Sequence, residues 1–552
     1  MKKSVRILCL VLASVMTVLA AVSCGGGQSN YLGVMLGTNV MSLDTNLATD
    51  GDSFEVIADC VDGLMQMDAE GAAIPAIAES YTLSEDGMTY TFKLRDAKWS
   101  NGAAVTANDF VFAWKRGVLG NEEYGYMFSD IGQIVNAAEI MEGKKDVSEL
   151  GVSAPDAKTL VVKLNVPVSY FPSLMYFPTF YPINEEFYNS LADGTYGTSP
   201  KTYLSNGAFV LEEYTPGAAS IKLKKNPDYW DAAKVSLEGI KYQVVGSSDS
   251  ALTAFKNKSL DIVMINGSQV AAVKGDAGLS KNLFVNGAGY MWYLTFSQTA
   301  KNANGDLANA NLRLAFSNAV NRQTIVDNCV MDGSIATYTA VPPQFAASAT
   351  TGEDFSGDQK KFAEFCSDDA AKAKEYFEKA KQELGKDTFT FTMIYGNNEG
   401  DEVSKVAQTI KEQIEATLTG VTVNLQPMTK AERLDKMQND NYEVALTRWG
   451  PDYADPMTYL GMWITNNANN YGFWSNAEYD AIIADCTTGK YVTDYDARWA
   501  ALYDAERIAL SEAVIAPLYT KANANLITEG VTGVEFHPVA LNRVYKNAKI
   551  EK

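Results

Sequence analysis

The most regular alternation of apolar and polar residues lies between residues 388 and 449 of the 552-residue chain. Three short runs there alternate residue by residue, which is typical of strands whose two faces differ in polarity. They are FTFTMIYG at 389–396, GVTVNLQ at 420–426 and YEVALTRW at 442–449. The pattern therefore predicts three strands in this part of the chain.

Two helices are predicted between these strands. In residues 429–440, Thr429 and Glu432 occupy the two positions of a capping box. In residues 401–418, the apolar side chains recur at helical spacing, at Val403, Val406, Ile410, Ile414 and Leu418. The resulting β-α-β-α-β order implies parallel strands joined by right-handed crossovers.

The chain before residue 388 predicts further helices and then a change of texture. Helices are expected at 311–330 and at 368–385, the second of which ends at Gly385. Further upstream, strand-like runs separated by turns predominate, and they suggest a second lobe with mixed sheets. These runs are YTFKLRD at 90–96, TLVVKLN at 159–165, ASIKLKKN at 219–226 and GIKYQVV at 239–245.

The stretch RWGPDYADPMTYL, residues 448–460, follows directly on the third strand. Gly450 and the prolines end the strand, so Asp452 and Asp455 are expected on a loop at its carboxyl end, among aromatic rings. In open α/β sheets, ligands bind at the carboxyl ends of the strands. We therefore expect a ligand site at this loop.

The N-terminal residues 1–23 are typical of a secretory signal peptide, with a basic start, an apolar stretch and small residues. The small residues end at Cys24, which resembles the lipid-modified cysteine of bacterial lipoproteins, although Ala21 stands where that pattern prefers leucine. Residues 24–30 would then be the lipid-anchored cysteine and a glycine-rich tether. An uncleaved anchor or a plainly secreted protein is the alternative. No later segment approaches the ~20 apolar residues of a membrane span.

The composition is acidic, with 67 acidic and 46 basic residues and a net charge of −21. Removal of Lys2, Lys3 and Arg6 with the signal peptide takes away three positive charges, so the mature chain carries −24. Such a charge disfavours nucleic acid, which binds through basic residues. It favours cationic small molecules and peptides at long range.

Several enzyme classes lack the residues they need here. His537 is the single histidine, so neither a histidine-based triad nor a common zinc site is expected; we interpret it as a packed or surface residue. No phosphate-binding glycine motif is present. The cysteines beyond residue 24 have no metal-ligand spacing, and one disulfide among them is possible: Cys60, Cys329, Cys366 and Cys486. We expect no metal and no cofactor. A carboxylate-pair hydrolase, which needs only Asp and Glu, stays as the rival.

Four blocks of sequence together resemble one family. They lie in the family's order at 75–116, 205–235, 311–326 and 448–460. The first is PAIAESYTLSEDGMTYTFKLRDAKWSNGAAVTANDFVFAWKR, and the second contains SNGAFVLEEY and KKNPDYW. These blocks are similar to the extracellular solute-binding proteins of family 5, the peptide, oligopeptide and nickel-binding receptors of ABC importers. The last block resembles the oligopeptide-binding branch.

The resemblance implies a periplasmic-binding-protein-like α/β fold of class II (cluster C). Two α/β lobes would enclose a ligand cleft, and a subdomain would be inserted in the first. We place lobe I at 31–74, 199–290 and 519–552, the inserted subdomain II at 75–198 and lobe III at 291–518. The lobes would then hinge where the chain crosses between them, at 286–293 and 514–519.

The resemblance also assigns roles within the 448–460 loop. In the oligopeptide-binding branch the aspartate of this motif binds the peptide's terminal ammonium, which places that role on Asp452. Trp449 and Tyr453 would exclude water and face the cation. Asp452 could instead cap the turn. For Asp455, which precedes Pro456, the turn role is the preferred interpretation.

Further peptide-binding residues follow from the same resemblance. The backbone of Asp62 and Gly63 would border the cleft on one lobe, and that of Arg448 and Gly450 would face it from the other. Two cleft tyrosines are assigned more loosely, and packing roles fit them equally well: Tyr124 and Tyr293.

Two departures from the family pattern concern the ligand. Pro451 replaces an alanine and removes an N–H donor beside the site, and Leu446 stands where some members have an arginine for peptide carboxylates.

The resulting expectation is a peptide-capturing lipoprotein that works with ABC permease subunits, and not an enzyme. We expect it to be a monomer outside the cytoplasm, anchored to the bacterial membrane by its lipid. Backbone recognition would make it tolerant of peptide sequence. The alternatives are a secreted carboxylate-pair hydrolase and a peptide-signal receptor on the same scaffold.

Overall fold

The computed structural model describes residues 30–551 apart from 70, 121–122, 349 and 401. The predicted signal peptide, Cys24 and nearly all of the tether therefore lie outside the described residues. Within the described ranges, no helix is long and apolar enough to cross a membrane.

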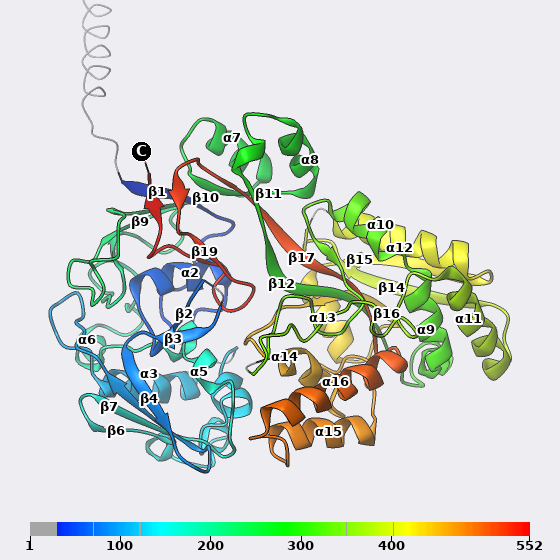
Figure 1. Cartoon of the computed structure of the whole chain (residues 1–552), viewed down its shortest axis with the longest axis horizontal. Helices are drawn as coiled ribbons and strands as arrows, with labels where there is room; N and C mark the ends of the chain where they lie inside the picture. Colours follow the sequence, from blue (N-terminus) through cyan, green and yellow to red (C-terminus); the bar gives the residue numbers. More distant parts are fainter. Residues whose placement is uncertain (1–29, 70, 121–122, 349, 401, 552) are drawn as a thin grey trace, which may run out of the picture.

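One large mixed sheet runs through both halves of the molecule (Figure 1). Its strands follow the order β15-β14-β16-β12-β17-β11-β1-β10-β9-β8. The bounds are β15 Val421–Met428, β14 Phe389–Gly396, β16 Val444–Trp449, β12 Leu283–Phe296, β17 Ile515–Ile527, β11 Ile262–Ile265, β1 Tyr31–Leu36, β10 Gly239–Val244, β9 Ser220–Lys225 and β8 Phe209–Glu213. The short β13 (Ile335–Ala336) pairs with β17.

The predicted β-α-β-α-β unit is confirmed. Strand β14 lies between β15 and β16 and is parallel to both. The helices between them are α12 (Val403–Thr417) and α13 (Lys430–Gln438), and α13 begins with the expected capping box of Thr429 and Glu432. The 448–460 loop therefore leaves β16 at the carboxyl edge of this parallel group.

Strands β12 and β17 join the two halves of the sheet. They pair antiparallel over most of their lengths, but the register shifts between Gly287 and Met291, where three residues of β12 lie opposite Lys521 of β17. The predicted crossover segments, 286–293 and 514–519, lie in or beside these two strands. The bulge interrupts the hydrogen-bond ladder at the middle of the molecule, so bending there would break fewer hydrogen bonds than bending within the paired parts of the two strands.

Helix 311–330 is not continuous, contrary to the prediction. Helix α9 (Ala310–Ala319) ends at the extended residue Val320, and α10 (Arg322–Ile325) begins anew, followed by a π-helical turn at Val326–Val330. The physical reason is Asn321, whose side-chain oxygen accepts a hydrogen bond from the N–H of Thr324 at 2.7 Å and so caps the second helix.

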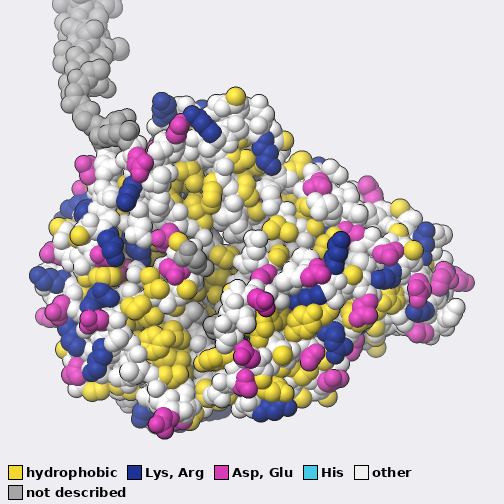
Figure 2. Space-filling view, viewed as in Figure 1, with side chains coloured by type: hydrophobic (Ala, Val, Ile, Leu, Met, Phe, Trp, Pro, Cys, Tyr) yellow, Lys and Arg dark blue, Asp and Glu magenta, His cyan; other side chains and the backbone are white. Residues whose placement is uncertain are grey.

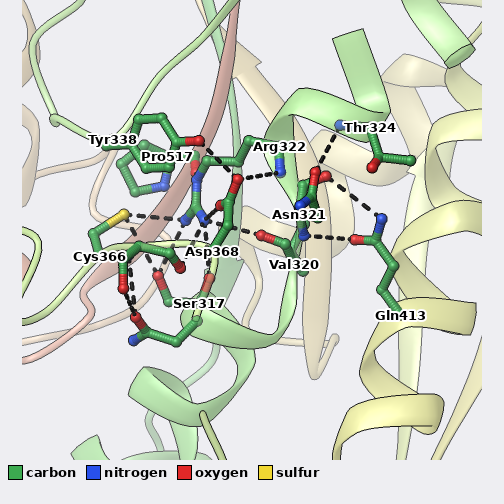
Figure 3. A network of polar contacts seen from close by, with 12 residues as sticks. Ser317, Val320, Asn321, Arg322, Thr324, Tyr338, Cys366, Asp368, Gln413 and Pro517 are labelled. Carbon is green, nitrogen blue, oxygen red and sulfur yellow. Dashed lines mark hydrogen bonds and ion pairs between the residues drawn. The ribbon is translucent and has the colours of Figure 1, made fainter. Parts of the chain in front are cut away.

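The buried Arg322 beside this break fastens it to strand β17 (Figure 3). Its Nε donates to the carbonyl of Pro517 at 2.6 Å, and its Nη1 pairs with Asp368 at 2.9 Å. Arg322 Nη2 also lies 3.0 Å from the Cys366 sulfur. Helix α11 (Ala370–Leu384) follows and ends at Gly385, as predicted.

A separate four-stranded antiparallel sheet lies at the lower left of Figure 1. Its order is β4-β5-β7-β6, with bounds Ala78–Leu83, Thr89–Leu94, Thr159–Lys163 and Val152–Asp156, and helix α3 (Ala107–Gly120) packs against it. All of it falls within residues 75–198. The boundaries of the lobes and of the inserted subdomain stay a prediction.

The remaining helices and strands complete the described chain. The α-helices are α2 Gly51–Cys60, α4 Ala137–Met141, α5 Phe171–Leu174, α6 Glu185–Ser190, α7 Ser248–Lys256, α8 Gly267–Gly275, α15 Ala477–Thr487 and α16 Tyr495–Ser511. The strand pairs are β2 Met65–Met67 with β3 Ala73–Pro75, β18 Val531–Thr532 with β21 Lys549–Ile550, and β19 Glu535–Phe536 with β20 Arg543–Val544. The four cysteines are buried and unpaired: Cys60, Cys329, Cys366 and Cys486.

Candidate functional site

The loop after β16 is short and tightly held. Trp449 is the last residue of β16, and helix α14 (Met457–Leu460) begins eight residues later. Asp455 accepts a hydrogen bond from the N–H of Met457, as a turn residue does, and it also forms a two-pronged ion pair with Arg498 of α16, with both distances at 2.8 Å. The turn role was predicted; the ion pair was not, because its partner is 43 residues away.

Asp452 is a half-buried residue at the carboxyl end of β16, and its carboxylate is largely desolvated. Its Oδ2 accepts a hydrogen bond from the Tyr126 hydroxyl at 2.6 Å, and its N–H donates to Thr458 at 3.3 Å. Burial raises the pKa of Asp452 to about 6; the Tyr126 hydrogen bond lowers that pKa, and the charge of Glu123 raises it. Among the described residues, no Lys or Arg forms an ion pair with it. The site therefore holds a desolvated carboxylate that lacks a counter-charge.

Aromatic residues from the 123–128 segment surround this carboxylate. Tyr124 stacks on Tyr126 with ring centroids 6.3 Å apart and also contacts Phe54 and Phe177. Burial raises the pKa of Tyr124, and the charge of Asp452 adds to that increase. Tyr124 was predicted as a cleft residue. Tyr126 was not, although it stands two positions away in the same EEYGYMF run.

Tyr453 joins the loop to another part of the chain. Its ring is buried and stacks on Tyr170, with centroids 4.7 Å apart. The guanidinium carbon of Arg498 in turn lies over the Tyr170 ring, 5.9 Å from the centre of that ring. Tyr453 therefore packs between the loop and the segment before α5, so its described contacts fix the loop in position.

Trp449 and Gly450 present two different features. The indole Nε1 of Trp449 is buried and has no hydrogen-bond partner among the described residues. The ring of Tyr290 packs directly against the backbone of Gly450. A side chain would not fit there, because a Cβ would lie 2.3 Å from a ring carbon of Tyr290. Tyr290, from the bulge of β12, was not predicted, since nothing local in the sequence marks it.

Arg448 belongs to a charged group at the ends of β14 and β16. Its Nε lies 3.3 Å from Glu399, and its guanidinium carbon lies 4.4 Å from the centre of the Tyr290 ring. Glu399 also binds the fully buried Arg433 at 2.8 Å. The sequence prediction concerned only the backbone of Arg448; the structure gives its side chain a place beside the same loop.

The other predicted residues have contacts of their own. Asp62 is buried; its carboxylate accepts hydrogen bonds from Tyr229 and Trp230, and its N–H donates to Asn206 at 2.8 Å. Gly63 packs so closely that a Cβ would lie 2.5 Å from the Met175 carbonyl. None of these contacts involves Asp452.

Tyr293 is fully buried in β12, paired with Thr447 of β16, and burial raises its pKa. The structure therefore brings Arg448, Trp449, Gly450, Asp452 and Tyr124 together around Tyr290 and Tyr126. Among the described residues, Asp62 and Gly63 are not tied to that group by a hydrogen bond.

A cavity of about 240 Å³ opens beside this group at the β12–β17 bulge. Its lining includes Gly289, Lys521, Phe345, Phe536 and Pro538. Gly289 lies between this cavity and the loop. It packs closely on both sides, since a Cβ at Gly289 would lie 3.1 Å from Pro451 of the loop and 2.1 Å from the Pro538 carbonyl.

The Tyr459 hydroxyl donates to the Gly289 carbonyl at 2.6 Å and ties α14 to the bulge. In Figure 2 apolar side chains gather around a hollow near the middle of this face. Across the described ranges, no group of three or more His, Cys, Asp or Glu side chains is arranged to hold a metal ion.

Comparison with known proteins gives consistent matches along the chain. Residues 72–471 match the family model described as bacterial extracellular solute-binding proteins, family 5. The dipeptide-binding protein of Lactococcus lactis subsp. cremoris is 31% identical, with 96% of each chain covered. The oligopeptide-binding protein OppA of Bacillus subtilis is 31% identical over 97% of each chain. The structure of Listeria monocytogenes OppA bound to peptide has a TM-score of 0.75 at 30% identity, covering 95% of this chain and all of that one.

Proposed function

The chain belongs to the bacterial extracellular solute-binding proteins of family 5, and from this premise we propose that it captures peptides for an ABC importer. It would hold the peptide outside the cytoplasm and deliver it to the permease subunits of that importer. Lobe I and lobe III would close on the ligand about the bulge of β12 and β17, and Cys24 would keep the protein at the membrane. The protein would act as a monomer.

The observation that carries this proposal is the state of Asp452. Its carboxylate is desolvated without a cationic partner among the described residues, and the nearby Glu123 adds negative charge. A peptide's α-ammonium has three donors and no acceptor, so it fits a carboxylate with free lone pairs. The rings of Tyr124 and Tyr126 exclude water, which strengthens the attraction between the two charges.

Other groups of the site suit the rest of a peptide. The buried Nε1 of Trp449 is a donor that would gain a partner from a ligand carbonyl. Residues 288–290 of the bulge lie outside the β12–β17 ladder, and of their backbone carbonyls that of Gly289 is taken by Tyr459, so the remaining backbone groups there would be the ones to meet the peptide main chain. Recognition through main-chain groups depends little on peptide sequence.

The rival carboxylate-pair hydrolase finds less support at this loop. Asp455 is occupied by its two-pronged ion pair with Arg498, so Asp452 and Asp455 do not offer two free carboxylates. The family consists of substrate-binding proteins.

We expect Asp452→Asn to weaken binding of a peptide with a free N-terminus. Asparagine keeps the shape but removes the counter-charge, and loss of one partner of a buried charge pair costs about 2–5 kcal/mol, roughly thirty- to several-thousand-fold in affinity. N-acetylation of the peptide should cost the wild type a similar factor and the variant little more, because both changes remove one interaction. Calorimetry on the four combinations measures this.

The matched control is Asp504→Asn, which removes an exposed carboxylate from α16 and should leave affinity unchanged. Asp452→Asn should also melt no lower than the wild type at pH 7, since an ionised buried carboxylate without a partner disfavours the folded state. Independent, additive losses from the variant and from acetylation would show that the ammonium binds elsewhere.

A further inference from the structure

The chain enters the large sheet at an edge where several strands begin or end. Strand β1 starts at Tyr31 and runs parallel to β10 and β11, so all three strands start at this edge. Strand β9 is antiparallel to β10 and β17 is antiparallel to β11, so both end here. Strand β12 begins here, because it is antiparallel to β17. We call this side the tether edge, because the predicted tether leads into it at Asn30.

Helices α7 and α8 bring their carboxyl ends toward the tether edge. Helix α7 connects the far end of β10 to the start of β11, and α8 connects the far end of β11 to the start of β12. Each helix therefore runs back toward the side on which β1 begins. The two helices form the top of the molecule in Figure 1, and basic side chains lie along this upper border in Figure 2.

Five exposed lysines lie at or near the tether edge. They are Lys224 near the end of β9, Lys256 in the last turn of α7, Lys258 before β11, Lys274 in the last turn of α8 and Lys281 before β12. The turn that holds Lys258 packs on β1, since a Cβ at Gly33 would lie 3.3 Å from the Leu260 backbone. Within the described chain, Lys281 pairs with Glu529, and the other four lysines form no ion pair.

The charge of this region is opposite in sign to that of the whole chain. From β9 to the start of β12, residues 220–283 hold nine lysines and six acids, a net charge of +3, whereas the full chain carries −21. Acids at the tether edge offset part of the positive charge: Glu238, Asp261, Asp276 and Glu529. A cation in the last turn of a helix is favourable in itself, which accounts for Lys256 and Lys274 but not for the other three lysines.

The predicted tether is too short to hold this edge far from a membrane. Six residues lead from Cys24 to Asn30, so the tether spans at most about 20 Å when fully extended. A glycine-rich chain of this length has a root-mean-square span of only about 13 Å. Attraction between charges acts over about 8 Å at physiological ionic strength. With a lipid on Cys24, the lysines would therefore come within reach of the headgroup charges, whereas anionic lipids would repel the acidic remainder of the surface.

We propose that the tether edge rests on the anionic lipid headgroups of the membrane, where its five lysines contact lipid phosphates and hold the anchored protein in one orientation. The partner of this surface is a lipid bilayer, which it recognises by charge. This inference rests on the lipid attachment at Cys24 that forms part of the proposed function. It assigns the lysines a role that peptide capture does not require.

The test couples the chain from Cys24 onward to vesicles through a maleimide lipid. Cys24 is the thiol that reacts, because the four cysteines of the described chain are buried. An uncharged N-hydroxysuccinimide ester then acetylates the lysines sparingly, and mass spectrometry gives the rate at each of them. The five lysines should react roughly threefold more slowly on vesicles of phosphatidylcholine and phosphatidylglycerol than on phosphatidylcholine alone.

Two internal comparisons belong to the same experiment. Lys374 and Lys430 are exposed lysines of the other half of the molecule and should react equally on both kinds of vesicle. High salt should remove the difference at the five lysines, because it screens their attraction to the headgroups.

A triple variant tests whether the lysines themselves provide the attraction. It carries Lys256→Gln, Lys258→Gln and Lys274→Gln. The two lysines that it retains at the edge, Lys224 and Lys281, should then react at nearly equal rates on the two kinds of vesicle. A matched control removes three exposed lysines from residues 291–518 and should keep the wild-type difference. It carries Lys360→Gln, Lys374→Gln and Lys430→Gln. Thermal unfolding checks that both variants fold.

Three results would overturn the proposal. Equal rates at the five lysines on the two kinds of vesicle would show that anionic headgroups do not hold this edge. Slower reaction at Lys374 and Lys430 instead would place another face on the membrane. A difference that persists in the triple variant would assign the orientation to the tether alone. If the wild type carries no lipid at Cys24, the anchor fails and this orientation with it, whereas peptide capture, measured by calorimetry, is decided separately.

Discussion

At the scale of single residues, the structure places charges where they are costly and leaves some of them unbalanced. The half-buried Asp452 has a hydroxyl as its nearest side-chain partner, and Arg448 shares one carboxylate with Arg433. Asp455, three residues from Asp452, is fully balanced by Arg498. Under the proposed function, Asp452 would meet the ligand, whereas Asp455 holds the loop in place.

Peptide binding should depend on pH through Asp452. The pKa of its carboxyl is raised to about 6 by burial, and only the ionised form attracts an ammonium. Affinity should therefore be highest near pH 7 and fall through pH 6, by about tenfold at pH 5; it should also decline towards pH 8, where the peptide's α-ammonium, of pKa about 7.7–8.0, begins to lose its proton. Calorimetry between pH 5 and 8 measures this. Asp452→Asn should be flat across the range; an equally steep profile in that variant would assign the titration to another group.

The free energy of unfolding should depend on Asp455. Asp455→Asn leaves the buried Arg498 without its counter-charge, and such a loss costs about 3–5 kcal/mol. Urea denaturation measures it, with Asp504→Asn as the exposed control. Adding Arg498→Met should recover part of the loss, because the uncompensated charge is then gone. A stability change below about 1 kcal/mol in Asp455→Asn would contradict this account.

At the scale of elements, the sequence predicts what depends on neighbouring residues. The period of apolar positions and the Thr429 cap were enough for the β-α-β-α-β unit, and Gly450 with the prolines marked the loop that carries Asp452. Tyr126 and Asp452 are 326 positions apart, so no local pattern could pair them. The break of helix 311–330 was missed because the periodicity continues across Asn321, whose capping role depends on side-chain geometry.

The β12–β17 bulge should be sensitive to substitution at one glycine and tolerant at another. Gly289 has a φ of +72°, and a Cβ there would lie 2.1 Å from the Pro538 carbonyl. Gly289→Ala should lower the free energy of unfolding by about 2–4 kcal/mol, from backbone strain and overpacking together.

Gly287→Ala, two residues earlier in the same strand, is the control, because a Cβ there meets nothing within 4 Å. Chemical denaturation of both variants gives the comparison. Equal stabilities would mean that the tail carrying Pro538 moves aside freely.

At the scale of the whole molecule, two halves share one sheet, and a hollow lined by apolar side chains lies near the middle of the face in Figure 2 (Figures 1 and 2). The chain enters and leaves the half that contains β14–β16 through β12 and β17, so the proposed closure of the lobes would bend these two strands. Arg322 anchors β17 at Pro517 on one side of the bulge, which favours bending at the bulge itself.

The membrane attachment proposed for the mature chain should depend on Cys24. Metabolic labelling with a fatty-acid probe should mark the wild type and leave Cys24→Ala unlabelled, since the cysteine is the proposed site of lipid attachment. Cell fractionation of both forms supplies the control for expression. Equal labelling of the two would remove the anchor from the proposed function.

The bond between Tyr126 and Asp452 has a consequence for timing. The Tyr126 hydroxyl, 2.6 Å away, occupies Oδ2, so an ammonium that engages both carboxylate oxygens must displace that hydroxyl or share Oδ2 with it. With displacement, association would proceed in two steps, a fast encounter at the site and a slower exchange of the hydroxyl for the ammonium. The observed rate would level off at high peptide concentration, and the same exchange in reverse would set how long a captured peptide resides before it is passed on.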